Sequence, residues 1–257
     1  MELNYLHGKK YTKAMAKGKQ LHEALQAETY VPLTIEPVTY QDLLYKIAYE
    51  NYMSLLTLKK TGKCREVRLY GSVNGYRISG QIDELLTKGG KTVIVEVKTT
   101  EAGKTPSAPV PHIIQVTLYR KLLEDLRTGA YGLENFSRSN DISKAKISDV
   151  FVRELKAAGV REELIDVNKM YSLMFGEFQA LPELSDRLEI RYIDRFSGKE
   201  VKSVEISYRK EEIDSNLQYA MKYWNGERES VPVPEEEKWK CKLCKFFGNE
   251  CEVWWNK

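Results

Sequence analysis

The stretch 65–98 constrains the fold of this chain more than any other. Polar and apolar side chains alternate at its start, and Asn74-Gly75 is a strong signal for a two-residue hairpin turn. A second strand is expected over 76–86. Residues 87–90 then turn the chain into a third strand over 91–98. The pattern therefore predicts a three-stranded antiparallel meander.

The turn between the second and third strands decides which of their side chains face each other. A four-residue turn places Asp83 opposite Ile94, whereas a two-residue turn at Gly89-Gly90 places it opposite Glu96. Under both registers Asp83 shares a face with Glu96 and Lys98, because side chains alternate with a period of two. Such neighbours lie within roughly 8 Å of each other. The other face is expected to be packed by Val93, Val95 and Val97.

A helix expected from about His112 to Arg127 adds two polar side chains, Gln115 and Tyr119. They are four residues apart, so they lie on one face of the helix. A Glu-x-Lys in a strand is by itself most often a solvent-facing ion pair. The carboxylate of Asp83, in phase with it, and the polar helix favour a functional site. Two carboxylates, an ammonium and neighbouring polar groups suit metal-dependent cleavage of a nucleic-acid backbone.

The other segments are predicted to be mostly helical. Apolar residues at helical spacing, the usual sign of core packing, predict two helices before the meander. The expected elements are helices over 12–28 and 39–60, a mostly helical stretch over 130–185, a hairpin of 188–192 with 201–208, and a helix over 211–224.

The bulk properties are those of a globular chain without a membrane-spanning segment. Its 257 residues can bury a sizeable core. A net charge of +3 permits a nucleic-acid partner but does not require one. No run of 18 apolar residues occurs, and residues 1–20 lack the apolar stretch of a signal peptide. We therefore expect an intracellular protein with no membrane partner, cytoplasmic in a prokaryote and nuclear or mitochondrial in a eukaryote.

Three of the four cysteines lie close together near the C-terminal end of the sequence. The spacing Cys241-x2-Cys244-x6-Cys251 is typical of a metal or cluster site rather than of a disulfide framework. The spacing fits zinc, for which a Cys3His site is ordinary, and an iron–sulfur cluster equally well. Either one needs a fourth ligand from elsewhere.

Several of these motifs together resemble a known family of nucleases. The core of RecB-type PD-(D/E)xK nucleases is similar to GQIDELL (80–86), VIVEVKTT (93–100) and IQVTLYRKLL (114–123), and Gly18 and His22 match that group's first motif. The resemblance is closer still to exonuclease V, with REVRLYGSVNGYRISGQIDEL (65–85) before the core and YWNGERE (223–229) followed by EEKWKCKLCKFFGNECEVW (236–254) at the end. It covers most of the chain and weakens over 130–185.

The resemblance implies an α/β restriction-endonuclease-like core with a helical insertion and a C-terminal iron–sulfur segment. It implies a single nuclease domain over 1–257 that acts as an exonuclease on single-stranded DNA in repair or replication. Within that domain we expect N-terminal helices over 1–62, a catalytic core over 63–129, a helical insertion over 130–185, and a hairpin, helix and cysteine segment over 186–257. A monomer is expected, and a single-strand-binding protein is a candidate partner.

The resemblance also assigns roles to individual residues. Asp83 and Glu96 supply hard oxygen ligands for Mg²⁺ or Mn²⁺, with His22 and the backbone carbonyl of Val97 as further ligands. Lys98 orients or deprotonates the attacking water, or stabilises charge on the phosphate. Gln115 and Tyr119 bind the scissile phosphate or position the lysine. Without the family, His22 is more simply explained as a partly buried helix residue.

For the cysteines, the resemblance implies a [4Fe–4S] cluster held by Cys241, Cys244 and Cys251. In the family a first cysteine precedes a Glu-Leu-x-Tyr-like stretch, and here Met1 stands where that cysteine is expected, before residues 2–5. The fourth ligand is therefore expected to be missing, unless Cys64 replaces it.

Two other functions share these motifs. One is a CRISPR-associated RecB-like nuclease that trims DNA ends, against which the YWNGERE-to-cysteine stretch argues. The other is a catalytically impaired module that binds nucleic acid, which the missing cysteine favours and the complete core motif does not.

Overall fold

The computed structural model describes most of the chain as two compact units. The described residues are 13–73, 75–100, 110–140, 142, 145–194, 196–235, 238, 241 and 244. One unit is made of Met1–Lys13 and Asp214–Lys257, and the other of Ala14–Ile213. The described residues of the predicted catalytic site all belong to the second unit.

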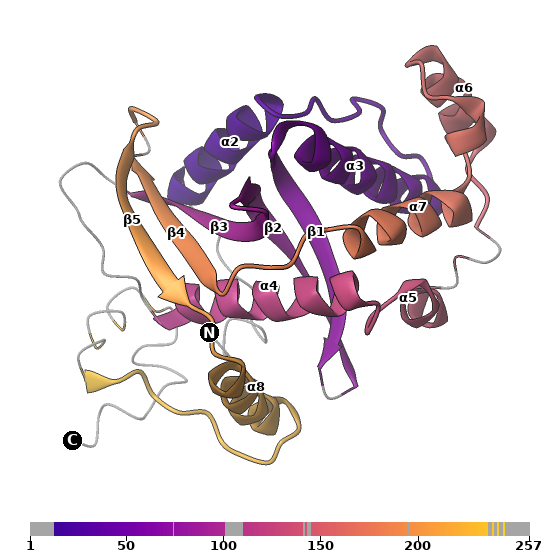
Figure 1. The fold of residues 1–257 in the computed structure, drawn as a ribbon. Coiled ribbons are helices and arrows are strands. Elements are labelled where there is room, and N and C mark those ends of the chain that lie inside the picture. Colours follow the sequence, from indigo (N-terminus) through magenta and orange to yellow (C-terminus); the bar gives the residue numbers. More distant parts are fainter. Residues whose placement is uncertain are drawn as a thin grey trace. The chain divides into compact units, whose positions relative to one another are not determined.

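A five-stranded mixed sheet with the strand order β1-β2-β3-β4-β5 forms the centre of the larger unit (Figure 1). Antiparallel pairing joins β1 (Lys63–Val73), β2 (Tyr76–Lys88) and β3 (Lys91–Thr100) into the predicted meander. The chain then crosses through helix α4 (Val110–Thr128) and the helical segments that follow it. It returns as β4 (Arg187–Asp194), parallel to β3, and β5 (Glu200–Ser207) pairs antiparallel with β4.

The turn between β2 and β3 is the two-residue alternative. Gly89 and Gly90 have φ values of 58° and 76°, which glycine adopts without strain and which a type I′ hairpin turn requires. Lys88 pairs with Lys91, and the ladder continues as far as Glu84 and Val95. Asp83 and Glu96 come next in this register, at the point where the two strands stop pairing.

Helices cover both faces of the sheet. In Figure 1, α2 (Lys13–Ala27) and α3 (Tyr40–Thr61) lie above the strands and α4 crosses below them. The apolar face of α2 packs Leu21 and Leu25 against a small core of Val95, Val97 and Ile193. The prediction that these valines supply packing is therefore confirmed. The larger core lies among α3, α4, β1 and β2 and continues into α7 (Val167–Gln179).

Helix α3 begins at a capping box that also ties down a distant segment. Thr39 accepts a hydrogen bond from the Asp42 N–H, and the Asp42 carboxylate accepts one from the Thr39 N–H. The same carboxylate accepts hydrogen bonds from the N–H and the hydroxyl of Ser148, both at 2.8 Å. Ser148 is itself the N-cap of α6 (Asp149–Ala157), so one buried aspartate holds the starts of two helices.

The element types and their bounds agree closely with those expected. The helical insertion consists of α5 (Leu133–Asn140), α6, the short 3₁₀ helix η2 (Glu162–Leu164) and α7, and the predicted C-terminal helix is α8 (Lys210–Trp224). The α/β class is confirmed by the five-stranded mixed sheet and its helices. The parallel pairing of β3 with β4 was not predicted.

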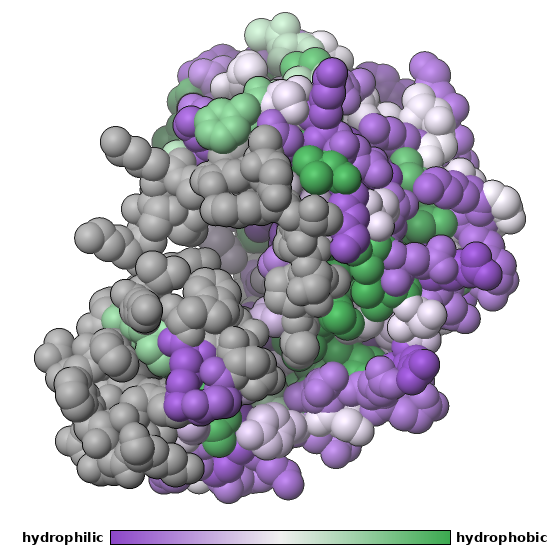
Figure 2. Space-filling model, turned by 90° about the vertical axis from the view of Figure 1, so that its left-hand side faces the viewer, coloured by the Kyte–Doolittle hydropathy of each residue, from purple (hydrophilic) through white to green (hydrophobic). Residues whose placement is uncertain are grey.

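The described surface shown in Figure 2 is largely hydrophilic, with smaller hydrophobic areas among the polar ones. Among the helices of the described segments, none combines the length and the apolar character needed to cross a bilayer.

Candidate active site

The end of the β2–β3 ladder carries the predicted acidic residues. The carboxylate of Asp83 does not pair across the ladder with Glu96; instead its Oδ2 accepts a hydrogen bond of 2.7 Å from the N–H of Val97. The neighbouring Glu84 serves a different purpose, because it forms buried ion pairs with Arg65 and with Arg191. Of two adjacent carboxylates, one therefore belongs to the site and the other to the packing of the sheet.

Lys98 connects β3 to helix α4. Its Nζ lies 2.5 Å from Glu96 Oε1 and donates a second hydrogen bond of 3.1 Å to Gln115 Oε1. The amide of Gln115 donates in turn to the hydroxyl of Tyr119 at 3.0 Å. The structure thus joins Glu96, Lys98, Gln115 and Tyr119 in one continuous chain of hydrogen bonds.

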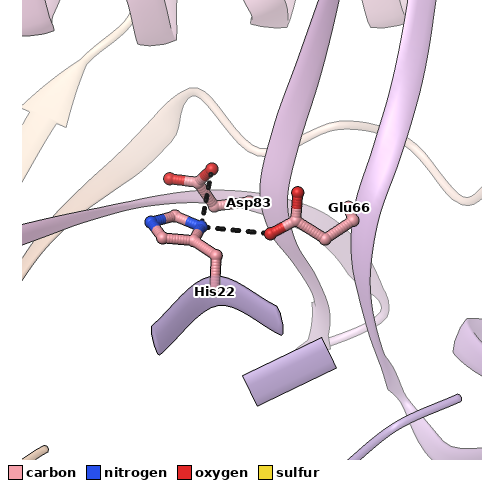
Figure 3. A group of neighbouring side chains, drawn as sticks. All are labelled: His22, Glu66 and Asp83. Atoms are coloured by element: carbon pink, nitrogen blue, oxygen red, sulfur yellow. Dashed lines mark hydrogen bonds and ion pairs between the residues drawn. The ribbon is translucent and has the colours of Figure 1, made fainter. Parts of the chain in front are cut away.

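His22 approaches the same place from helix α2. Its Nδ1 lies 3.4 Å from Asp83 Oδ1 and 3.0 Å from Oε1 of Glu66, a strand β1 residue (Figure 3). One ligand atom from each of these three residues lies within 4.8 Å of the others, a grouping that could hold a metal ion. Glu66 was not among the expected residues. Glu66 could have been found from the hairpin between β1 and β2. Its register, with Val73 paired to Tyr76, places Glu66 across from Asp83.

Burial and like charges shape the acid–base properties of this cluster. Burial, followed by repulsion from Glu96, raises the pKa of Asp83 to about 7. The pKa of Glu96 is also raised by burial, which outweighs the opposing effect of Lys98. The hydrogen bond to Glu66 raises the pKa of His22 against the effect of burial. Carboxylates that resist ionisation in this way would be stabilised as anions by a nearby cation.

One oxygen of the cluster lacks a partner among the described residues. Glu96 is only 1% exposed, and no described group donates a hydrogen bond to its Oε2. A buried carboxylate oxygen in this state is costly unless something else, such as a cation, binds it.

The structure describes only part of the cysteine segment. The Cys244 N–H donates a hydrogen bond of 3.0 Å to the Cys241 carbonyl, so these two residues lie close together. Cys251 and Met1 lie outside the described residues. Cys64 is buried at 1% exposure in the core of the larger unit, and burial strongly raises the pKa of its thiol. A protonated, fully buried thiol is a poor candidate for the fourth cluster ligand.

Asp83, Glu96 and Lys98 lie where β2 and β3 diverge, and the Gln115–Tyr119 face of α4 contacts the lysine. This arrangement agrees with the resemblance to PD-(D/E)xK nucleases. Comparison with known proteins specifies the family further. The profile of the family described as "Exonuclease V - a 5' deoxyribonuclease" matches residues 1–91 and 160–255, well over half of the chain. The chain belongs to the exonuclease V family.

The family profile leaves residues 92–159 unmatched, and this stretch contains part of the predicted site. The matched ranges include His22, Glu66 and Asp83 and all three clustered cysteines. The other predicted catalytic residues, Glu96, Lys98, Gln115 and Tyr119, lie in the unmatched stretch. An exonuclease V from Danio rerio is 27% identical over 249 residues, which cover 93% of this chain and 61% of that protein. The chain thus spans less than two thirds of the length of that relative.

Two solved structures are also similar. The crystal structure of SSO0001 is 15% identical with a TM-score of 0.37, covering 90% of this chain and 91% of that one. A structure from Eubacterium rectale with a provisional exonuclease assignment is 11% identical with a TM-score of 0.39, covering 96% of this chain and 77% of that one. Scores this low carry no conclusion about fold or activity.

Proposed function

We propose that this protein is a Mg²⁺-dependent exonuclease that degrades single-stranded DNA. The observation that carries the proposal is the hydrogen-bonded chain from Glu96 through Lys98 and Gln115 to Tyr119, with Asp83 and His22 beside it. Membership of a family described as a 5′ deoxyribonuclease supports DNA as the substrate and the 5′ end as the point of attack. A role in repair or replication, with the protein acting as a monomer, belongs to the same proposal.

The residues present fit a divalent cation. Asp83 and Glu96 are hard oxygen donors, and the unpartnered Oε2 of Glu96 is available as a ligand. His22 and the Val97 carbonyl complete the proposed ligand set. When bound by these residues, such a cation would supply Lewis-acid chemistry, which lowers the pKa of a coordinated water and offsets negative charge on a phosphate.

The remaining residues act by position and charge. Lys98 is held between Glu96 and Gln115, so its ammonium is fixed where it can orient the attacking water or stabilise charge that develops on the phosphate. Gln115 fixes the lysine, and Tyr119 fixes Gln115. Because a strand and a packed helix already hold these side chains in place, little further conformational entropy is lost when the transition state forms.

The proposal includes a [4Fe–4S] cluster on Cys241, Cys244 and Cys251, with zinc as the alternative metal. All three positions lie within the range matched by the exonuclease V profile. Since Cys64 is buried in the core, a thiol of this chain is not proposed for the fourth position.

The test is digestion of single-stranded DNA labelled at its 5′ or its 3′ end, with Mg²⁺. The wild-type protein is expected to release short products, whereas Glu96→Gln and Lys98→Met lose more than about a hundredfold in rate. Glu205→Gln, which removes an exposed strand β5 carboxylate paired only loosely with Arg187, is the matched control and should retain full activity. Equal rates in wild type and Glu96→Gln would refute the assignment of the site. Preferential digestion of duplex DNA or RNA would refute the assignment of the substrate.

A further inference from the structure

Glu66 has an unusual backbone for a residue within a strand. Among the described residues other than glycine, it alone has a positive φ, at 55°. A side chain in that region is strained, because its Cβ crowds the neighbouring carbonyl. With this backbone conformation the carboxylate of Glu66 points at the ring of His22, as does that of Asp83 from the adjacent strand (Figure 3).

The spacing of these atoms matches that of ligands around one cation. Nδ1 of His22 lies 3.0 Å from Glu66 Oε1 and 3.4 Å from Asp83 Oδ1. Neighbouring ligands of an octahedral ion with bonds of about 2.1 Å are separated by about 3 Å. The two carboxylate oxygens and Nδ1 all lie within 4.8 Å of one another, so side-chain movements that bring them closer would let the three atoms share an ion.

The second oxygen of Glu66 is fixed separately. Gln81, on strand β2, donates a hydrogen bond of 2.6 Å from Nε2 to Glu66 Oε2. This bond holds the carboxylate in place and leaves Oε1 on the side of His22 and Asp83. Groups that orient ligands in this way are a regular part of metal sites.

An independent observation also points to an ion here. Glu96, with its buried and unpartnered Oε2, exerts its charge on His22 and is itself affected by the charge of Glu66. Three carboxylates thus face one lysine and one histidine. An ion pair between Glu66 and His22 alone would leave the buried oxygen of Glu96 without compensation.

We propose that Glu66 is a further ligand of the catalytic metal, oriented by Gln81 and sharing the ion with His22 and Asp83. The inference rests on the proposed function, since it assumes that the site binds a divalent cation. It adds a carboxylate from strand β1 to the ligands from α2, β2 and β3.

The experiment is a titration of Mn²⁺, followed by the loss of the electron paramagnetic resonance signal of the free ion, without DNA. Compared with wild type, Glu66→Gln is expected to raise the Kd for Mn²⁺ at least about tenfold. Glu66→Gly should do the same with a melting temperature no lower than that of the wild type, because glycine accepts this φ without strain. Glu205→Gln is the control and should bind as the wild type does.

Asp83→Asn, measured alongside, separates failure of the inference from failure of the proposed function. If Asp83→Asn weakens Mn²⁺ binding while Glu66→Gln and Glu66→Gly bind as tightly as the wild type, Glu66 is a structural partner of His22 and the inference is wrong. If none of the variants, Asp83→Asn included, changes Mn²⁺ binding, the metal site itself is wrong and the proposed function fails with it.

Discussion

The carboxylate of Asp83 binds the N–H of Val97 across strands β2 and β3, at 2.7 Å. The regular ladder ends at the pair formed by Glu84 and Val95. Asp83 lies one residue beyond that pair and Val97 two residues beyond it. A side chain therefore replaces a backbone acceptor at the point where the strands diverge. The divergence of the strands leaves room for the acidic cluster, and the hydrogen bond fixes Asp83 relative to strand β3.

Two substitutions of Asp83 should separate this structural bond from metal binding. Asp83→Asn keeps an oxygen that can accept from Val97 but loses the charge, so nuclease activity should fall more than about a hundredfold with the fold intact. Because the ionised Asp83 is disfavoured by burial and by Glu96, the metal-free Asn variant should be at least as stable as the wild type at pH 8. Asp83→Ala also leaves the Val97 N–H without an acceptor, at a cost of about 1–3 kcal/mol relative to Asn. Urea denaturation with EDTA and a DNA digestion assay measure both effects; an Ala variant as stable as Asn would contradict the role of this bond.

Two glycines that pack against helix α4 provide a matched pair. A Cβ at Gly80 would lie 2.4 Å from Cε1 of the Tyr119 ring, and one at Gly71 would lie 2.4 Å from Cδ2 of Leu122. Both Gly→Ala variants should lose about 1–3 kcal/mol of stability through overpacking. Only Gly80→Ala should also reduce kcat, because it displaces the tyrosine that holds Gln115. Steady-state kinetics below the melting temperature of both variants test this, and equal kcat values would argue against a positioning role for Tyr119.

Asp42 should make the protein sensitive to acid. Burial would raise the pKa of its carboxyl, but the hydrogen bonds from Ser148 and Thr39 outweigh burial and lower it. Since the pKa is lower in the folded state, the stabilisation is present above the unfolded pKa of about 3.9 and is lost as the pH falls through the folded value. Asp42→Asn should therefore be less stable than the wild type at pH 7 by about 1–3 kcal/mol, and the gap should narrow towards pH 3. Urea denaturation at several pH values gives the two curves, and a constant gap would contradict the assignment.

The cysteine segment predicts a coloured protein. Anaerobically purified wild type should show the broad visible absorbance of an iron–sulfur cluster, with matching iron and sulfide, and Cys241→Ser should lose most of it. Cys64→Ser should keep the colour, because that thiol lies in the core. A colourless protein that contains one equivalent of zinc would replace the cluster with a zinc site.

Much of the fold follows from local patterns in the sequence. Alternation along β2 and β3, with glycines at both positions of their turn, determines the pairing and brings Asp83 near Glu96 and Lys98. The parallel placement of β4 beside β3 could not be predicted in the same way, because it depends on a long crossover through α4 and α7 that periodicity does not encode.

The site shows a similar limit. Gln115 and Tyr119 were predicted from their spacing on one helix face, and a hydrogen bond joins them in the structure. Glu66, which we propose as a further ligand, was not predicted, because an isolated glutamate in an alternating strand has no distinctive pattern. The proposal for Glu66 depends on its left-handed backbone and on its contact with a histidine 44 residues away in sequence, neither of which local sequence patterns encode.

The turn at Gly89-Gly90 has a consequence for how this family of sequences can vary. Because paired residues of antiparallel strands face the same side, a residue added to the turn can be accommodated as a three-residue loop with the pairing of Lys88 and Lys91 unchanged. A residue added or removed within β2 after Asp83, or within β3 before Glu96, would instead shift the register and turn one of the two acids to the other face. Length variation should therefore be tolerated at the turn itself and not in the strands on either side of it.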